Sequence, residues 1–354
     1  MAAETVLITG AGGRIGRLLA ERLSERYRIA GFVHGDPDCP GGFAVCAGVE
    51  LDQPESVEAA LEQVRAASGE HLASVVHLAG YYSFRDPDDP RHEAVNLHGT
   101  ESLLRGLRRF QVGQLLFAST MLVHSPCEPG ERIREDSPLA WETGWGYPRT
   151  KLQAEQLLRR EHGAVPLVLA RIASVYDELC RHPALARQLQ RIYERDLTGH
   201  LYPADPDRGM TYLHMEDLLD ALVRIVDRRA ELPPEAALLL GEDEPVPYGE
   251  IQREAGRLLH GKEWETIPVP AAAAKAGAWL QEKLAPADDP PFIRPWMIDR
   301  AADHYALDTT RAKQLLDWAP RHTLRETLPT MLEALRRDPD AWYEANGLEL
   351  RESD

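Results

Sequence analysis

Short apolar runs alternate with longer amphipathic stretches through the first 120 residues of the chain. The apolar runs are "TVLIT" (5–9), "RIAGFV" (28–33), "SVVHLAG" (74–80) and "QLLFAS" (114–119). Helical patterns lie between them, at about 14–26, at about 54–67 and up to about residue 110. Apolar strands that alternate with helices are typical of a parallel sheet covered by helices on both faces. The pattern therefore predicts an α/β fold with a doubly wound parallel sheet.

The rhythm changes after "PLVLARI" (166–172), a further strand that follows a helix at about 147–162. Clusters of Pro and Gly interrupt the chain at 203–209, 241–249 and 285–295. We interpret residues 1–174 as the sheet domain, to which 211–235 return, and 175–210 with 236–335 as a smaller substrate-binding lobe. Residues 336–354 are expected to form a surface tail or a partner contact.

The composition of the chain limits the classes of partner that the protein is expected to bind. The 354 residues carry a net charge of −17, which argues against nucleic acid and against an anionic membrane surface. No apolar run approaches the roughly 18 residues that a spanning helix needs, and the N-terminus has neither a basic region nor a cleavage site. Cys39, Cys46, Cys127 and Cys180 form no C-x-x-C pair, which favours a reduced cytoplasmic chain without a metal site.

A glycine-rich turn joins the first strand to the first helix. Gly10, Gly13 and Gly16 are spaced three residues apart in "TGAGGRIG". Glycine allows a tight turn and a close approach of the backbone to a pyrophosphate, and the helix N-terminus presents free N–H groups. An ordinary tight turn is the alternative. The position between a strand and a helix favours a dinucleotide site.

Tyr147 and Lys151 lie four residues apart in "GWGYPRTK", so a helix would place both on one face. A free tyrosine titrates near pH ~10. A neighbouring cation favours the phenolate and is expected to lower that pKa by roughly one to three units. The same spacing also occurs on helices where the two side chains only share a solvated surface. The spacing therefore suggests proton transfer without establishing it.

Several further motifs along the chain favour the proton-transfer interpretation. They are "HLAG" (77–80), "NLHGT" (96–100), "FASTMLVHS" (117–125), "RIASVYD" (171–177), "TYLHMEDLLDAL" (211–222) and "YALDTTRAKQLLDWAPRHTL" (305–324). Together with the glycine turn and the Tyr/Lys pair, they resemble the extended short-chain dehydrogenase/reductase family, also called the NAD-dependent epimerase/dehydratase family. The resemblance covers residues 4 to about 335 and implies a Rossmann-type sheet domain followed by the smaller lobe.

The resemblance also implies roles for particular side chains. Tyr147 would be the acid/base, and Lys151 would lower its pKa and bind the nicotinamide ribose. Thr120 would polarise the substrate oxygen, with Ser119 as the competing hydroxyl. Asn96 would hold a water or a backbone kink in the proton path. His124 stands where family members usually have Tyr.

The resemblance implies a nicotinamide cofactor, NADP or NAD. Family members that bind NAD carry an acid after the second strand, whereas this chain has His34 there, with Asp36 two residues on. Arg14 in the glycine turn is a candidate ligand of a 2′-phosphate, so the sequence favours NADP. Asp52 resembles an adenine-binding residue, or else caps the following helix. The full expected cofactor set is Gly10, Gly13, Arg14, Ile15, Gly16, His34, Leu51, Asp52, Leu78, Ala79, Gly80, Tyr147, Lys151 and Ile172.

The sequence constrains the identity of the substrate less than that of the cofactor. Tyr82, Thr120 and Ser174 are the expected substrate contacts, and Tyr81 and Phe84 either share that role or pack between the lobes. Dehydratases of the family carry Asp-Glu after the catalytic Thr, whereas this chain has Met121-Leu122. Nucleotide-sugar epimerases usually carry Asn at the position of Ser174. Arg208, Arg294 and Arg300 are either anion ligands or surface residues.

Three functions follow from these observations. The first is an NAD(P)-dependent oxidoreductase acting on a small-molecule carbonyl or secondary alcohol. The second is a nucleotide-sugar epimerase with tightly bound NAD. The third is a non-catalytic NADP-binding redox sensor, which the Tyr147/Lys151 pair argues against. Relatives often pair through two long helices, here 91–110 and 147–162, so a homodimer is expected.

Overall fold

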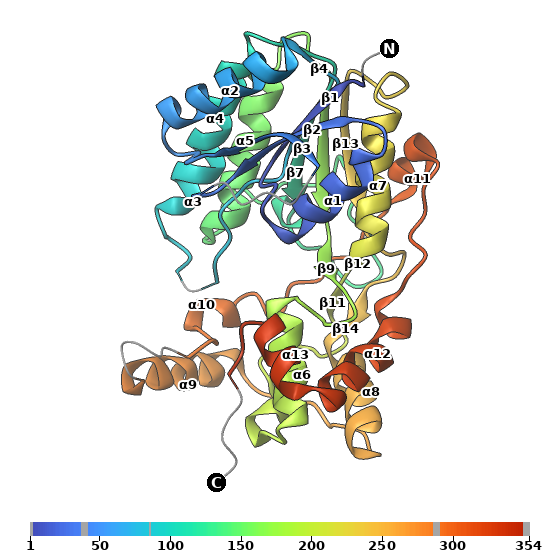
Figure 1. Cartoon of the computed structure of the whole chain (residues 1–354). Coiled ribbons are helices and arrows are strands. Elements are labelled where there is room, and N and C mark those ends of the chain that lie inside the picture. Colours follow the sequence, from blue (N-terminus) through green and yellow to red (C-terminus); the bar gives the residue numbers. More distant parts are fainter. Residues whose placement is uncertain (1–2, 37–41, 85, 286–290, 350–354) are drawn as a thin grey trace.

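Seven parallel strands form the central sheet, in the order β13-β8-β7-β5-β1-β2-β3 (Figure 1). The computed structural model describes residues 3–36, 42–84, 86–285 and 291–349. The strands of the sheet are β1 (Thr5–Thr9), β2 (Arg28–Val33), β3 (Phe43–Gly48), β5 (Ser74–His77), β7 (Leu115–Thr120), β8 (Leu167–Ile172) and β13 (Glu235–Leu240). All neighbouring strands pair in parallel. The predicted doubly wound parallel sheet is confirmed.

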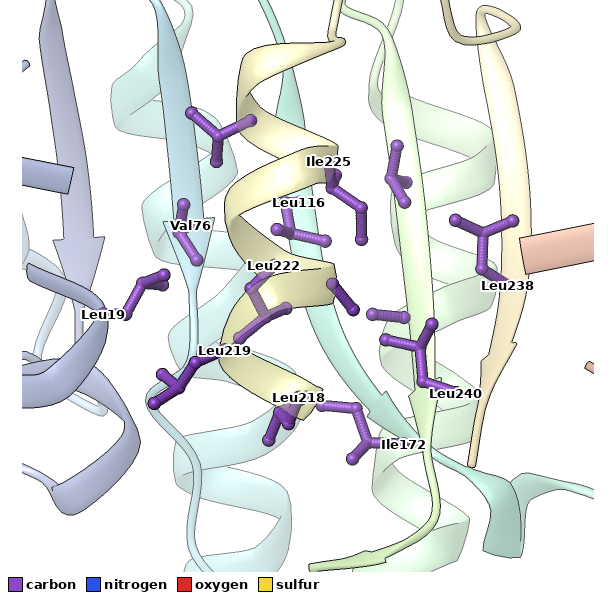
Figure 2. Close-up of a cluster of buried hydrophobic side chains, with 14 of the residues drawn as sticks. Leu19, Val76, Leu116, Ile172, Leu218, Leu219, Leu222, Ile225, Leu238 and Leu240 are labelled. Atoms are coloured by element: carbon purple, nitrogen blue, oxygen red, sulfur yellow. The ribbon is translucent and has the colours of Figure 1, made fainter. Parts of the chain in front are cut away.

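Helices cover both faces of this sheet. One face packs against α1 (Arg14–Ser24), α7 (Met215–Asp227) and α11 (Thr310–Leu316), and the other against α2 (Pro54–Ser68), α4 (Gly99–Leu107) and α5 (Gly146–Glu161). Figure 2 shows Leu218, Leu222 and Ile225 of α7 directed at the sheet strands. Each such fully buried side chain stabilises the fold by about 1.5–3 kcal/mol. The sheet is therefore a rigid base for the residues at its carboxyl edge.

A third apolar cluster, separate from the two that lie on the faces of the sheet, lies beyond that edge. Its helices are α6 (Pro183–Tyr193), α8 (Tyr248–His260), α12 (Leu324–Arg337) and α13 (Pro339–Ala345) (Figure 1). The helices α9 (Ala271–Leu284) and α10 (Pro295–Ile298) pack against each other at the side of this lobe. Shorter elements complete the described chain: β4 (His71–Leu72), α3 (Arg91–Glu93), a π-helix (Ala94–His98), β6 (Gln111–Val112), 3₁₀ turns (Met121–Val123 and Leu197–His200), β9 (Ser174–Tyr176), β10 (Leu201–Tyr202), β11 (Gly209–Met210), β12 (Tyr212–His214), β14 (Val246–Pro247) and β15 (Ile267–Pro268).

The C-terminal segment differs from the expected surface tail. The Asp338 carboxylate accepts a hydrogen bond from the Ala341 N–H and so caps α13. Trp342 and Tyr343 of this helix are buried in the apolar cluster of the second lobe. Because two large aromatic side chains are removed from water here, residues 339–345 are part of the lobe rather than an appendage.

Two further details of the structure differ from what the sequence predicts. Residues 43–48, which are not among the predicted strands, form the edge strand β3. Cys46 in this strand is disulfide-bonded, whereas Cys127 and Cys180 are free, so the expectation of an entirely reduced chain is wrong at Cys46. Within the described residues, we find no helix that has both the length and the apolar composition needed to cross a bilayer.

Candidate functional site

The glycine turn packs too closely for side chains. Gly10 has φ +71°, and a Cβ atom there would lie 2.9 Å from the Ala79 nitrogen. A Cβ atom at Gly16 would overlap the Gly10 carbonyl oxygen. Gly13 is the N-cap of α1 and provides no capping side chain. The first turn of α1 thus keeps backbone N–H groups for a ligand, which is the property that a dinucleotide phosphate site requires.

A buried chain of hydrogen bonds joins this turn to the next strand. The Thr9 hydroxyl accepts from the Ala79 N–H at 3.2 Å and lies 2.6 Å from His77 Nδ1. His77 Nε2 lies 3.0 Å from the Thr100 hydroxyl, which donates to the Asn96 carbonyl oxygen. Because the Thr100 hydroxyl donates to Asn96, His77 Nε2 carries a proton, and a neutral ring accepts from the Thr9 hydroxyl at Nδ1. Burial, together with the nearby charge of Lys151, lowers the pKa of His77 to about 3, in agreement with the neutral form.

Asn96 fixes the backbone that follows β5. Its side-chain oxygen accepts from the Tyr81 N–H at 2.6 Å, and its amide nitrogen donates to the Tyr81 carbonyl oxygen at 3.0 Å and to Thr150 Oγ1 at 3.1 Å. Asn96 lies in the π-helix, a rare element found frequently at functional sites. A Cβ atom at Gly80 would lie 3.0 Å from Lys151 Nζ and 3.1 Å from Asn96 Oδ1. Asn96 therefore positions the segment beside Lys151.

Tyr147 lies in the first turn of α5, directly opposite the end of β7. The Thr120 side chain lies close enough to its hydroxyl group to affect the pKa of the phenol, and Thr120 Oγ1 accepts the Leu122 N–H at 3.2 Å. Desolvation raises the pKa of Tyr147 to about 12, and the hydrogen bond from Thr120 opposes this increase. The structure thus holds a protonated phenol next to a second hydroxyl.

Lys151 is buried one helical turn farther along α5. Its Nζ atom donates to the Ala118 carbonyl oxygen at 2.9 Å and lies 4.6 Å from the centre of the Phe117 ring. Burial lowers the pKa of Lys151 to about 8, and Glu155 opposes this decrease. The expected lowering of the Tyr147 pKa by Lys151 is not found, because desolvation of the phenol dominates.

Ser119, the competing hydroxyl, faces away from Tyr147. It donates to Glu155 Oε1 at 2.5 Å, because successive side chains of β7 point to opposite faces.

Glu155 also forms a buried ion pair with Arg171, with Nη2–Oε2 at 2.7 Å and Nε–Oε1 at 3.1 Å. Arg171 Nη1 lies 2.8 Å from His124 Nε2, which explains the histidine at this position. Burial and the Arg171 charge lower the pKa of His124 to about 4, so its neutral ring accepts from Arg171.

The residues expected near the adenosine lie as follows. Arg14 pairs with Asp177 at 2.6 Å, and Arg181 pairs with the same carboxylate at 3.1 Å. His34 is exposed at the end of β2, and its Nε2 lies 3.1 Å from Glu50 Oε2. Asp52 is exposed and is not the cap of α2, because the N-cap residue is Gln53.

The remaining expected contacts are mostly apolar packing positions. Leu51 is buried against Gly99, and Ile172 ends β8. Ile15 and Leu78 pack at the margin of the core beneath the glycine turn. The Ser174 hydroxyl donates to the Met210 sulfur at 3.1 Å.

Aromatic rings surround Tyr147. The Tyr82 ring packs edge-on against it at 4.7 Å between centroids, and the Trp145 ring lies at 5.7 Å. Phe292 and Trp296 extend this group from the second lobe. The sequence reasoning missed both, and it missed Trp145, although Trp145 stands two residues before Tyr147. Tyr81, by contrast, donates from its hydroxyl to Asp89.

The three arginines proposed as anion ligands are each held by acidic partners. Arg208 pairs with Glu128 and Arg294 with Glu282. Arg300 lies 3.4 Å from Asp303 and donates to Thr143 Oγ1 at 3.0 Å. Over the described ranges, no cluster of three or more potential metal ligands occurs.

Comparisons with known proteins agree with this geometry. Residues 6–241 match the model of the NAD dependent epimerase/dehydratase family. A 4-hydroxy-2-methyl-3-oxo-4-farnesyl-3,4-dihydroquinoline-1-oxide ketoreductase of Stigmatella aurantiaca is 25% identical over 339 residues, covering 92% of this chain and 95% of the relative. A 3 beta-hydroxysteroid dehydrogenase/Delta 5-->4-isomerase of Mycobacterium tuberculosis is 22% identical, covering 92% and 89%.

Among solved structures, the UDP-glucose 4-epimerase of Thermus thermophilus in complex with NAD superposes with a TM-score of 0.67. It is 22% identical in sequence, and the superposition covers 94% of this chain and 99% of that one. This similarity establishes the fold, while the family match extends over well over half of the chain. The chain belongs to the NAD-dependent epimerase/dehydratase family, the extended short-chain dehydrogenases/reductases.

Proposed function

We propose that this protein is an NAD(P)-dependent oxidoreductase that interconverts a carbonyl group and a secondary alcohol. The observation that carries the proposal is the placement of the Tyr147 phenol beside the Thr120 side chain, at the carboxyl end of β7 and next to the buried Lys151. Two hydroxyl groups at one point bind a substrate oxygen from two sides. A relative that matches this chain over nearly the whole length of both proteins is named a ketoreductase. This similarity supports a redox reaction.

The glycine turn fits a dinucleotide, because its backbone leaves no room for side chains and the first turn of α1 presents N–H groups. Gly10, Gly13 and Gly16 would hold the pyrophosphate, and Tyr147 and Lys151 the nicotinamide ribose. When bound, the nicotinamide would supply or accept the hydride.

Tyr147 would move the proton. With a pKa raised to about 12, the phenol is protonated at neutral pH and is suited to donate to a developing alkoxide. Thr120 would hold the same oxygen through its hydroxyl. Lys151, fixed by the Ala118 carbonyl oxygen and the Phe117 ring, would keep a positive charge near the phenolate formed by this transfer.

For the cofactor we propose NAD rather than the NADP that the sequence favours. Arg14 is engaged by Asp177, and Glu50 places a carboxylate beside His34, where it would repel a 2′-phosphate. Solved structures with this fold, among them a dTDP-glucose 4,6-dehydratase and the UDP-glucose 4-epimerase of Thermus thermophilus, contain NAD.

Replacing Glu50 tests this choice. Glu50→Gln is expected to raise the affinity for NADPH relative to NADH by about tenfold, since one like charge is removed. The measurement is the ratio of the two dissociation constants, by calorimetry, in both proteins. A wild-type protein that already prefers NADPH would refute the assignment.

The first measurement for the reaction itself is to denature the purified protein and quantify the released dinucleotide. Protein that exchanges its cofactor freely and consumes NAD(P)H with carbonyl substrates is expected. Near-stoichiometric, tightly held NAD would instead support the epimerase alternative.

The variant Tyr147→Phe tests whether the protein is an enzyme or a non-catalytic redox sensor. The variant is expected to lose hydride transfer by at least about 100-fold, because general acid catalysis contributes 10²–10⁴ in rate. It is expected to retain dinucleotide binding through the glycine turn and Lys151. A Phe variant with full activity in the cell would contradict the enzymatic role.

A further inference from the structure

Six aromatic side chains form a continuous series of ring contacts that starts at Tyr147. We name this group the aromatic wall: Tyr82, Phe84, Trp145, Tyr147, Phe292 and Trp296. Within the sheet domain, Tyr82 packs on Tyr147 at 4.7 Å, and Phe84 stacks on Trp145 at 4.9 Å. The wall then crosses to the second lobe, where Trp145 meets Trp296 at 5.5 Å and Phe84 meets Phe292 at 5.9 Å.

The rings of the aromatic wall are not simply core residues. Tyr82 is 42% exposed, Trp145 alone is buried, and the others are half-buried. None of the six belongs to the three apolar clusters of the described chain. Aromatic surface that stays accessible beside a pair of reactive hydroxyls is typical of a binding site for an apolar ligand.

Two arginines of the second lobe near the aromatic wall are already engaged by acidic residues. A nucleotide sugar carries a diphosphate, which proteins bind with cationic side chains and bidentate guanidinium groups. Arg294, between Phe292 and Trp296 in sequence, is paired with Glu282, and Arg300 is paired with Asp303. A diphosphate at either position would have to displace a carboxylate from its partner.

We propose that the substrate is a fused-ring or aryl ketone, or the matching secondary alcohol, whose apolar body lies on the aromatic wall. Its oxygen meets the hydroxyls of Tyr147 and Thr120. In the reductive direction the carbonyl carbon gains a hydride from reduced nicotinamide, and the oxygen gains the Tyr147 proton. The C=O π bond is thereby replaced by a C–H and an O–H bond, and the nicotinamide is oxidised. This inference rests on the proposed function, which supplies that hydride.

The test compares four probes: 2-tetralone, 2-decalone, dihydroxyacetone and UDP-glucose. Binding is measured by calorimetry on Tyr147→Phe, where no turnover interferes, and reduction is followed with the wild type and NADH. The two fused-ring ketones are expected to bind at least about tenfold more tightly than dihydroxyacetone, since they bury far more apolar surface. UDP-glucose is expected not to bind.

Substitutions in the second lobe make the test specific to the aromatic wall. In the Tyr147→Phe background, Trp296→Ser is expected to weaken 2-tetralone binding about tenfold. Trp279→Ser, at a tryptophan of α9 that is 54% exposed, is the matched control and should leave it unchanged. Phe292→Ala provides a second variant should Trp296→Ser lower the melting temperature.

The outcomes separate the two proposals. Tighter binding of UDP-glucose than of 2-tetralone, or 2-tetralone binding that neither wall variant weakens, overturns the substrate class and leaves the oxidoreductase proposal standing. Fused-ring ketones that bind as expected, while the wild type oxidises no NADH with any probe, support the substrate class and refute the proposed function.

Discussion

At the scale of single residues, the candidate site depends on glycines, because the side chains that they lack leave space for neighbouring groups. Gly80 leaves the space that Lys151 Nζ and Asn96 Oδ1 occupy, and Gly16 leaves the space of the Gly10 carbonyl oxygen. The ammonium of Lys151 is consequently held against Ala118 and Phe117 by its surroundings on several sides. The neighbouring residues therefore act on Tyr147 and Lys151 mainly by fixing where the two side chains lie, and less by changing the pKa of Tyr147.

Gly80→Ala tests this point. The new Cβ atom would lie 3.0 Å from Lys151 Nζ, so the ammonium must move by a few tenths of an ångström. We expect kcat to fall about tenfold, because small displacements of catalytic groups cost rate steeply, with little change in melting temperature. Gly144→Ala, where a Cβ atom meets nothing within 4 Å, is the matched control. Equal kcat values for the two variants would contradict the positioning role.

At the scale of elements, the sequence predicted the strands that lie inside the sheet. The expected runs at 5–9 and 28–33 coincide with β1 and β2, since continuous apolar runs are distinctive. The edge strand β3 was missed although "FAVCA" (43–47) is itself an apolar run, because it directly follows the Pro- and Gly-rich stretch at 37–42. Local patterns also cannot reveal contacts over long sequence separations, which is why Phe292 and Trp296 were not connected with Tyr147. The orientation of Ser119 toward Glu155, away from Tyr147, likewise needed the coordinates.

The ion pair between α5 and β8 is a stability determinant. Glu155→Gln removes one charge and leaves the buried guanidinium of Arg171 without its partner. Breaking a buried pair in this way costs about 3–5 kcal/mol, which urea unfolding would measure. Glu101→Gln is the control, because Glu101 pairs with Arg105 on the surface of α4 and contributes at most about 1 kcal/mol. Similar losses in both variants would disprove this role of the buried pair.

At the scale of the whole molecule, buried histidines with lowered pKa values make folding sensitive to acid, and His77 and His124 are two of them. His77 and His124 are neutral in the folded protein, with pKa values lowered to about 3 and about 4, whereas an unfolded histidine titrates near ~6.5. The unfolded chain therefore binds more protons below pH ~6.5, and the free energy of unfolding falls as the pH decreases from there toward 4.

We expect a loss of a few kcal/mol between pH 6.5 and 4.5, at about 1.4 kcal/mol per unit of pKa difference. Urea unfolding at a series of pH values measures it. His124→Gln is expected to reduce the slope in this window, and His98→Gln, at an exposed histidine of the π-helix, is the matched control. An unchanged slope in His124→Gln would argue against a neutral buried ring.

The aromatic wall has a consequence for how such a protein diversifies. Its rings come from short segments at 82–84, 145–147 and 292–296, and they contribute to none of the three apolar clusters that hold the described chain together. Substitutions at Phe84, Phe292 or Trp296 would therefore change the proposed substrate surface at a smaller cost in folding free energy than substitutions within those clusters. One scaffold can in this way acquire new substrates by a few exchanges at its surface, without rebuilding its interior.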